Sequence, residues 1–188
     1  IYLLMTFIIH NIIKYLEKDL TTDILLKTKK RNVNERIKLD KITLNIGVKE
    51  ANINSNKILP PLLILKLLTQ QQPICTKAKK SISNFKLREG KIIGCKVTLR
   101  NSKKQAFLET LVHLILPQLT ESKKLRYKNR RPTNQLTLGL EDTNIFFELE
   151  NQYDYLPETY GLSITLTSKE NLLNMDKLLY SGLKLKFQ

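Results

Sequence analysis

Hydrophobic and polar residues alternate in four stretches of the chain, and this pattern predicts four β-strands that each bury one face. The four stretches are residues 41–46, 92–99, 135–140 and 162–167. A fifth, shorter strand is expected to open at residues 73–76. In the stretch 92–99, Val97 and Leu99 are expected on one face of the strand. The opposite face then carries Lys96, Thr98 and Arg100.

Apolar residues at helical spacing predict helices between these strands. The expected helices cover residues 10–30, residues 62–68, a segment through Phe107 to Ile115, and a last segment that ends before Gly182. Pro60 and Pro61 suit the start of the second helix. Residues 102–105, Ser-Lys-Lys-Gln, fit a capping box for the third helix, which Pro117 is expected to end or kink. Residues 167–170 are expected to cap the last helix.

Three segments lack a clear period and are expected to form loops. Residues 50–57 are rich in Asn, residues 77–91 are basic with Gly90 as a turn, and residues 141–160 are acidic and aromatic. The order of elements predicts an α+β fold of RRM-like, split β-α-β type. We expect an antiparallel-type sheet with helices packed on one face, and a long basic loop between its second and third strands. The other face is free to meet a partner.

The domain organisation is expected to be simple. Residues 1–40 form an N-terminal helical extension with a basic break at 27–31, and residues 41–188 form a single α+β domain with a basic insert at about 121–133. The first 13 residues are nearly all apolar but fall short of the ~20 that cross a bilayer. We therefore expect a buried or partner-packed helix start, with a membrane tether as the alternative.

Charge indicates the class of partner. The chain has 188 residues, and its 32 Lys and Arg against 17 Asp and Glu give a net charge of +15. A chain this basic pairs with a polyanion, either nucleic acid or an acidic membrane surface. Its richness in Ile, Leu, Lys and Asn suggests an A/T-rich genome, typical of an organelle or a reduced bacterium.

The charges are also segregated along the chain. The first basic segment, residues 77–104, contains Glu89 as its sole acid. A second basic cluster consists of Lys123, Lys124, Arg126, Lys128, Arg130 and Arg131. Residues 132–168 contain acids but no Lys or Arg. A merely solvated surface mixes the two signs, so this separation favours two faces with different partners. Phe85, inside the first segment, could stack on a base or pin the loop to the core.

Candidate chemistry is sparse, so no enzyme is expected. The sequence lacks a phosphate-binding loop and a Gly-rich dinucleotide turn. The two His lie far apart in the sequence and the two Cys form no C-x-x-C motif, so no Cys/His zinc site within the chain, and no metal or other cofactor, is expected. His113 lies on an apolar helix, where a core or boundary role is expected. Cys75 and Cys95 are interpreted as small core hydrophobes on strands that could be neighbours.

Residues 71–100 contain a long sequence motif that is more specific than composition or charge. The run T-K-A-K-K-S-I-S-N-F-K-L-R-E-G at 76–90 leads into I-G-C-K-V-T-L-R at 93–100. Together with K-I-T-L-N-I-G-V at 41–48 and Y-G-L-S-I-T-L at 160–166, it resembles the large-subunit ribosomal protein five family of bacterial and organellar type, and its mitochondrial form in particular.

The resemblance implies a structural role in translation, as a ribonucleoprotein component of the central protuberance of the large ribosomal subunit. It implies contacts with large-subunit rRNA, and with 5S rRNA if the ribosome has it. The implied rRNA-binding residues are Asn45, Gln71 and Thr98, which match the family's 5S-contacting positions, together with Lys96 and Arg100. The loop that would reach P-site tRNA contains Lys77, Lys79, Lys80, Ser81, Phe85, Lys86 and Arg88. The second basic cluster is expected to meet RNA.

The resemblance also implies protein partners and a location. Neighbouring central-protuberance proteins are expected, as is a small-subunit head protein reached through an intersubunit bridge, for which the acidic stretch 141–158 is the candidate. No small-molecule substrate is expected. The expected location is the mitochondrial matrix ribosome, with an organelle-encoded gene, and the alternatives are a plastid or the bacterial cytoplasm. A membrane-tethered protein or an extra-ribosomal RNA-binding module remains the alternative function.

Overall fold

The computed structural model describes residues 18–20, 22–27, 38–122, 125–130, 135–150 and 158–169. Its strands are β1 (Leu39–Gly47), β2 (Ile74–Lys77), β3 (Ile92–Leu99), β4 (Leu125–Arg130), β5 (Gln135–Leu140) and β6 (Leu162–Ser168). Its labelled α-helices are α2 (Leu59–Thr69), α3 (Asn101–Thr110) and α4 (Leu116–Ser122). Short 3-10 helices are η2 (Lys49–Asn52), η3 (Ser55–Ile58) and η4 (Ser83–Phe85), and a π-helical turn, η5, covers Leu111–Ile115.

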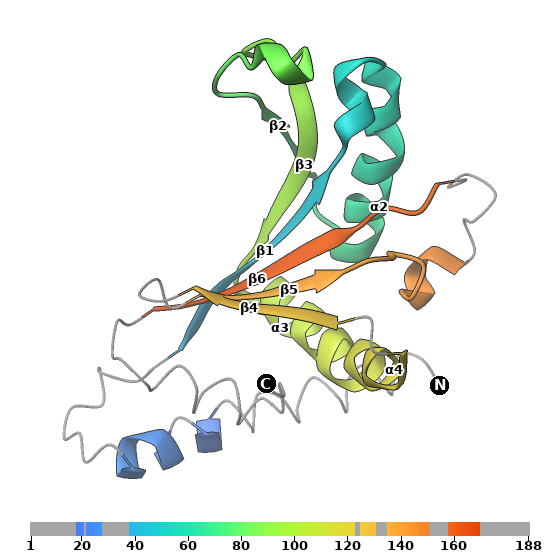
Figure 1. Cartoon of the computed structure of the whole chain (residues 1–188). Coiled ribbons are helices and arrows are strands. Elements are labelled where there is room, and N and C mark those ends of the chain that lie inside the picture. The colour runs from blue at the N-terminus through green and yellow to red at the C-terminus, as the bar shows by residue number, and fades with distance from the viewer. Residues whose placement is uncertain are drawn as a thin grey trace.

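The strands form one six-stranded sheet in the order β2-β3-β1-β6-β5-β4, and every neighbouring pair is antiparallel (Figure 1). Strands β1 and β2 flank β3 and are connected through α2, which is the split β-α-β arrangement that the sequence predicts. Adding β6 beside β1 completes the RRM-like order, and β5 and β4 extend it. The basic insert expected near 121–133 therefore contains a sheet strand, β4, that the sequence analysis missed.

The core lies between one face of the sheet and the helices. Alternate residues of β1 are fully buried, among them Ile42, Leu44 and Ile46, and the same alternation continues in β5 and β6. From the helical layer, Ile64 and Leu65 of α2 join this cluster, as do apolar residues of α3 and η5. The expected packing of helices on one face of the sheet is confirmed (Figure 1).

The helical segment after β3 differs from its prediction in two ways. It begins at Asn101 with Arg100 as its N-cap, and no side chain makes a capping hydrogen bond there, so the predicted capping box is wrong. Pro117 does not end the helix, because α4 continues through it. The preceding residues adopt the π-helical turn η5 instead. Since Pro lacks an N–H, a local departure from α-helical geometry just before it is expected physically.

Other predicted elements agree or lie outside the described residues. The strands predicted at 41–46, 92–99, 135–140 and 162–167 are confirmed, as is the helix after Pro60 and Pro61. The Asn-rich segment 50–57 is not a plain loop, because it folds into η2 and η3. Of the helix predicted at 10–30, residues 18–20 and 22–27 are described and are helical. The last predicted helix, beyond residue 169, lies outside the described part.

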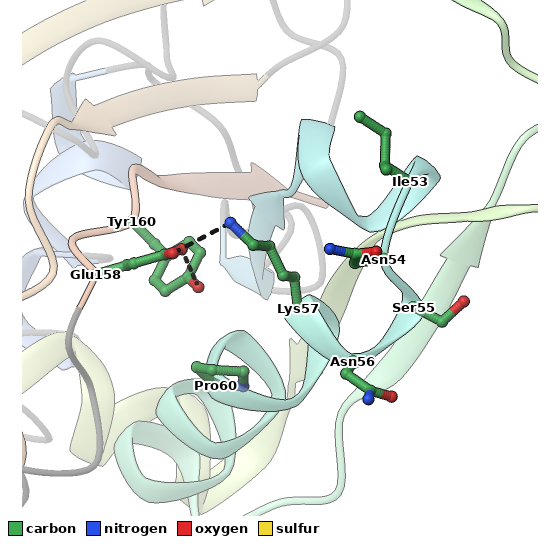
Figure 2. Close-up of a pocket in the computed structure, with 8 residues that line it drawn as sticks. All are labelled: Ile53, Asn54, Ser55, Asn56, Lys57, Pro60, Glu158 and Tyr160. Atoms are coloured by element: carbon green, nitrogen blue, oxygen red, sulfur yellow. Dashed lines mark hydrogen bonds and ion pairs between the residues drawn. The ribbon is translucent and has the colours of Figure 1, made fainter.

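A network of ion pairs and hydrogen bonds connects the segment just before β6 to η2 and η3 (Figure 2). Lys57 of η3 pairs with Glu50 and with Glu158, the latter at 3.2 Å, and the Tyr160 hydroxyl donates to Glu158 Oε2 at 3.0 Å. The hydrogen bond from Tyr160, and then the one from Lys57, lowers the pKa of Glu158. Burial, and then the bond to Glu158, raises the pKa of Tyr160 to about 12.

Gly94 is expected to be required for the close approach of β3 to β1. A Cβ at Gly94 would lie 2.5 Å from the Ile46 carbonyl oxygen, whereas one at its register partner Gly47 would meet nothing within 4 Å. Gly94→Ala should lower the free energy of unfolding by about 1–3 kcal/mol because the backbone cannot yield cheaply. Gly47→Ala is the matched control and should change it little. Urea unfolding of both variants measures this, and equal effects would contradict it.

The network at Tyr160 predicts an alkaline dependence of stability. The pKa of Tyr160 in the fold is raised above its unfolded value, so its contribution is complete below about pH 10 and is lost as the pH rises towards about 12. The difference in free energy of unfolding between the wild-type chain and Tyr160→Phe should therefore shrink over this range. Urea titrations at pH 9 and pH 11 test it, and a difference that does not change with pH would contradict the assignment.

Candidate nucleic-acid interface

The sheet face opposite the buried face carries polar residues in rows that cross four strands. We call it the open face, and two of its rows are Lys96–Asn45–Ser163–Gly139 and Thr98–Thr43–Thr165–Thr137. These side chains are exposed or half-buried, and the Oγ1 atoms of Thr137 and Thr165 lie 3.3 Å apart. The open face therefore offers hydroxyl, amide and ammonium groups, and the exposed Ile74 of β2 lies opposite Lys96 in the register. The sequence analysis named only its β1 and β3 members, although the polar half of each alternating strand predicts the rest.

The three positions carried over for 5S rRNA lie close together. Asn45 is exposed on β1, one row away from the half-buried Thr98 of β3. Gln71, just before β2, donates a hydrogen bond from Nε2 to the Thr98 carbonyl oxygen at 3.3 Å. The structure thus brings close to one another three residues that are up to 53 positions apart in sequence.

The two basic candidates on the β3 segment differ in their surroundings. Lys96 is exposed, and it stands opposite Asn45 in the register. Arg100 pairs through one guanidinium nitrogen with Asp40 at 3.1 Å. Because part of its charge is compensated, Arg100 offers a phosphate less net attraction than Lys96 does.

The basic loop, residues 77–91, begins with the last residue of β2, joins β2 to β3 and is internally hydrogen-bonded. Ala78 N–H donates to Lys91 O at 2.8 Å, and Gly90 N–H to Ala78 O at 3.0 Å. Further out, Ile82 and Leu87 form an antiparallel bridge. The prediction of a long loop between the second and third strands is confirmed, but the loop is more regular than expected.

The loop presents its cations to solvent. All of the predicted tRNA-loop residues are exposed: Lys77, Lys79, Lys80, Ser81, Phe85, Lys86 and Arg88. Within the described residues, none of the basic side chains in this set forms an ion pair. The Ser81 hydroxyl oxygen accepts a bond from Glu89 N–H at 2.9 Å, so it also holds the loop. Uncompensated cations on a protruding segment form a surface suited to a polyanion.

The sequence is compatible with two roles for Phe85, stacking on a base or packing the loop against the core, and the exposure of its side chain excludes the second role. Its side chain is 73% exposed, so it does not pin the loop to the core in the described structure. An exposed aromatic ring among cations fits stacking on a base or sugar.

The second basic cluster lies on or beside β4. In the strand register, Arg126, Lys128 and Arg130 pair with Gly139, Thr137 and Gln135; Gly139 and Thr137 belong to the rows of the open face. For Arg126, Lys128 and Arg130 the structure describes the backbone alone, and Lys123, Lys124 and Arg131 lie outside the described residues. The strand register thus places half of this cluster at the edge strand of the same sheet.

A hollow of about 580 Å³ among the described residues is a second candidate site (Figure 2). It lies between the η2–η3 segment and the start of β6, and Lys57, Glu158 and Tyr160 line it. Lys57 and Tyr160 both bond to Glu158, so these three groups stabilise the fold at this point. Within the described ranges, no three His, Cys, Asp or Glu side chains gather as metal ligands would.

The cysteine and histidine interpretations need partial correction. Cys95 is buried as expected, but Cys75 is only half-buried, because it lies on the edge strand β2. The two residues are register partners on neighbouring strands, and both are free thiols. Burial, and then the charge of Cys75, raises the pKa of Cys95 to about 12. His113 is exposed on η5, so the core or boundary role expected for it is wrong.

The segment considered for a membrane tether, residues 1–13, lies outside the described residues. Among the residues that are described, the structure contains no helix with the length and apolar character to span a bilayer.

Comparison with known proteins identifies the family. Residues 32–88 match the family model of ribosomal protein L5, and residues 92–187 match the model for the C-terminus of the same ribosomal family. Large ribosomal subunit protein uL5m of Reclinomonas americana is 38% identical over 172 residues, which are 92% of this chain and 94% of that protein. Large ribosomal subunit protein uL5 of Nitrosomonas europaea is 33% identical over 177 residues, or 94% and 98% of the two chains. The chain therefore belongs to the ribosomal protein L5 family, whose members are structural rather than enzymatic proteins of the large ribosomal subunit.

Proposed function

We propose that this chain binds ribosomal RNA within the large subunit through its open face and its basic segments. The observation that carries the proposal is the position of the uncompensated cations. They project from the basic loop at one end of the sheet, and the exposed Lys96 stands among hydrogen-bonding groups on the open face. Phosphate contacts from Lys and Arg supply affinity, and polar side chains fix the register on the RNA.

Within this function, the open face is the surface for structured rRNA. Asn45, Gln71 and Thr98 contact 5S rRNA in the central protuberance if the ribosome has it, and large-subunit rRNA otherwise. Lys96 and Arg100 add phosphate contacts along the same edge of β3, and the second basic cluster extends the surface along β4. The close grouping of the first three residues supports a single continuous RNA contact.

The basic loop reaches towards P-site tRNA. Its exposed cations neutralise phosphates of the tRNA elbow, and Phe85 stacks on a base or sugar. A tRNA that must pass through the ribosome needs contacts that form and break readily. Solvated Lys side chains provide such contacts, because each carries a hydrated point charge on a flexible stem.

The acidic stretch 141–158 faces a protein partner, which we identify as a basic head protein of the small subunit reached across an intersubunit bridge. Phe147 is 54% exposed, close in sequence to the exposed acids Glu148 and Glu150. Glu158 does not contribute, since Lys57 and Tyr160 already engage it. Neighbouring proteins of the central protuberance complete the assembly.

The location that fits these features is the mitochondrial ribosome, with the chain encoded in the organelle. The relative from Reclinomonas americana is named as a uL5m protein, and the composition of this chain is that of an A/T-rich genome. The alternative locations are a plastid or a bacterial cytoplasm, since the chain is also similar to a bacterial relative over most of that relative's length.

Asn45→Ala should weaken binding to an rRNA fragment from the central protuberance by roughly fivefold, the equivalent of one net hydrogen bond of about 1 kcal/mol. Asn56→Ala is the matched control, because Asn56 is also an exposed Asn but lies on η3, away from the open face. Filter binding at fixed salt measures both. Equal affinity of the wild-type and Asn45→Ala proteins would contradict a role for the open face in RNA binding.

Replacing the five loop cations Lys77, Lys79, Lys80, Lys86 and Arg88 with Ala should weaken retention of P-site tRNA by roughly tenfold and flatten its salt dependence. Incorporation into the large subunit should be preserved. A control with the same loss of charge replaces five exposed lysines elsewhere, namely Lys27, Lys38, Lys49, Lys66 and Lys169. Sedimentation of purified subunits followed by tRNA filter binding separates the two effects. Failure of incorporation in the loop variant would make the loop an rRNA anchor instead.

A further inference from the structure

One side chain outside the basic loop binds the tip of that loop. Asn52, the last residue of η2, donates from Nδ2 to the carbonyl oxygens of Phe85 and Lys86, each at 3.2 Å. Both partners are acceptors, so only the amide nitrogen of Asn52 can face them, and this settles the orientation of the amide. Asn52 precedes the loop tip by more than 30 residues, so this is a tertiary contact.

The platform that carries Asn52 is itself fixed to the sheet. Val48, between β1 and η2, donates its N–H to Ile93 O of β3 at 2.9 Å, and Ala51 of η2 is buried in the core. Lys91, at the base of the loop, donates from Nζ to the Asn52 carbonyl oxygen at 3.0 Å. Asn52 is therefore held by its backbone on one side, while its side chain holds the loop on the other. Figure 1 shows the η2–η3 turns and the loop at the same end of the molecule.

The contact engages the loop backbone and leaves the loop side chains free. Phe85 and Lys86 both remain exposed although their carbonyl groups are bonded. Lys86 has a φ of 51°, in the left-handed region that costs a non-glycine residue free energy. Two bonds from Asn52 at this point help to offset that cost and favour one direction for the tip.

We propose that Asn52 is a positioning residue that clamps the tip of the basic loop and sets the direction in which Phe85 and the loop cations face RNA. The inference rests on the proposed contact between the loop and tRNA. A free loop keeps its charge but samples many directions, so it must be ordered again each time that it binds. Clamping the tip removes much of that ordering cost.

Asn52→Leu tests the clamp, because Leu has nearly the same size but cannot donate. Asn52 Oδ1 is buried and has no partner among the described residues, so an apolar replacement loses only the amide bonds. Hydrogen exchange at the amides of Lys86 and Leu87, which bond to Ser83 O and Ile82 O, should accelerate about 10- to 30-fold. Exchange in β1 should stay unchanged. Asn54→Leu, at an exposed Asn two residues away, is the control and should leave loop exchange unaltered.

Retention of P-site tRNA is the second measurement. Asn52→Leu should lower it about fivefold while preserving its salt dependence, because every cation remains; the five-cation variant should flatten that dependence. Unchanged exchange at Lys86 and Leu87 would overturn the clamp. Faster exchange with retention lowered only in the cation variant would overturn the positioning role. Faster exchange with retention lowered in neither variant would uphold the clamp and refute the tRNA contact itself.

Discussion

The register of β1 between β3 and β6 determines what the rest of this molecule can do. Side chains along a strand alternate between the two faces, so a shift by one residue would move Ile42, Leu44 and Ile46 to solvent and bury Asn45. The two faces of β1 therefore depend on each other, because the register that buries its apolar side chains also exposes its polar side chains on the open face. The close passage of Gly94 over the Ile46 carbonyl adds a steric constraint in the same pair of strands.

The acidic and basic side chains of the chain are used differently. Three acids, Asp40, Glu50 and Glu158, bond to Arg100 or Lys57 and stabilise connections within the domain. The loop cations have no such partners among the described residues, and their mutual repulsion is a cost of the free protein. A polyanion removes that cost on binding. The same arrangement that raises the electrostatic free energy of the isolated chain thus favours the binding of a polyanion.

The sequence predicts those parts of the fold that depend on local pattern. Strong alternation located β1, β3, β5 and β6, and Pro60 and Pro61 located α2. Strand β4 was missed because Leu125–Arg130 is dominated by charged and polar residues, and its pairing with β5 becomes visible only in the sheet. The capping box failed because the helix starts at Asn101, so that Ser102 lies within it. Sequence spacing alone cannot distinguish a residue at the cap from one already in the first turn.

The candidate site was predictable to a similar extent. The exposed cations and Asn45, Gln71 and Thr98 were found from charge and from the family motif. The Thr and Ser rows of the open face required the register, and Asn52 required a contact between η2 and a loop more than 30 residues away.

The open face and the basic loop are connected by the same two strands. Strand β3 starts where the loop ends and carries Lys96 and Thr98, while β1 carries Asn45 and leads directly into the turn that bears Asn52. The bond from Val48 N–H to Ile93 O closes the β1–β3 pair at the point where both segments leave the sheet. Backbone pairing consequently fixes the base of the loop relative to the open face, and the proposed Asn52 clamp acts at the tip. In the function that we propose, an RNA on the open face and an RNA at the loop would therefore be held at a defined separation without contacting each other.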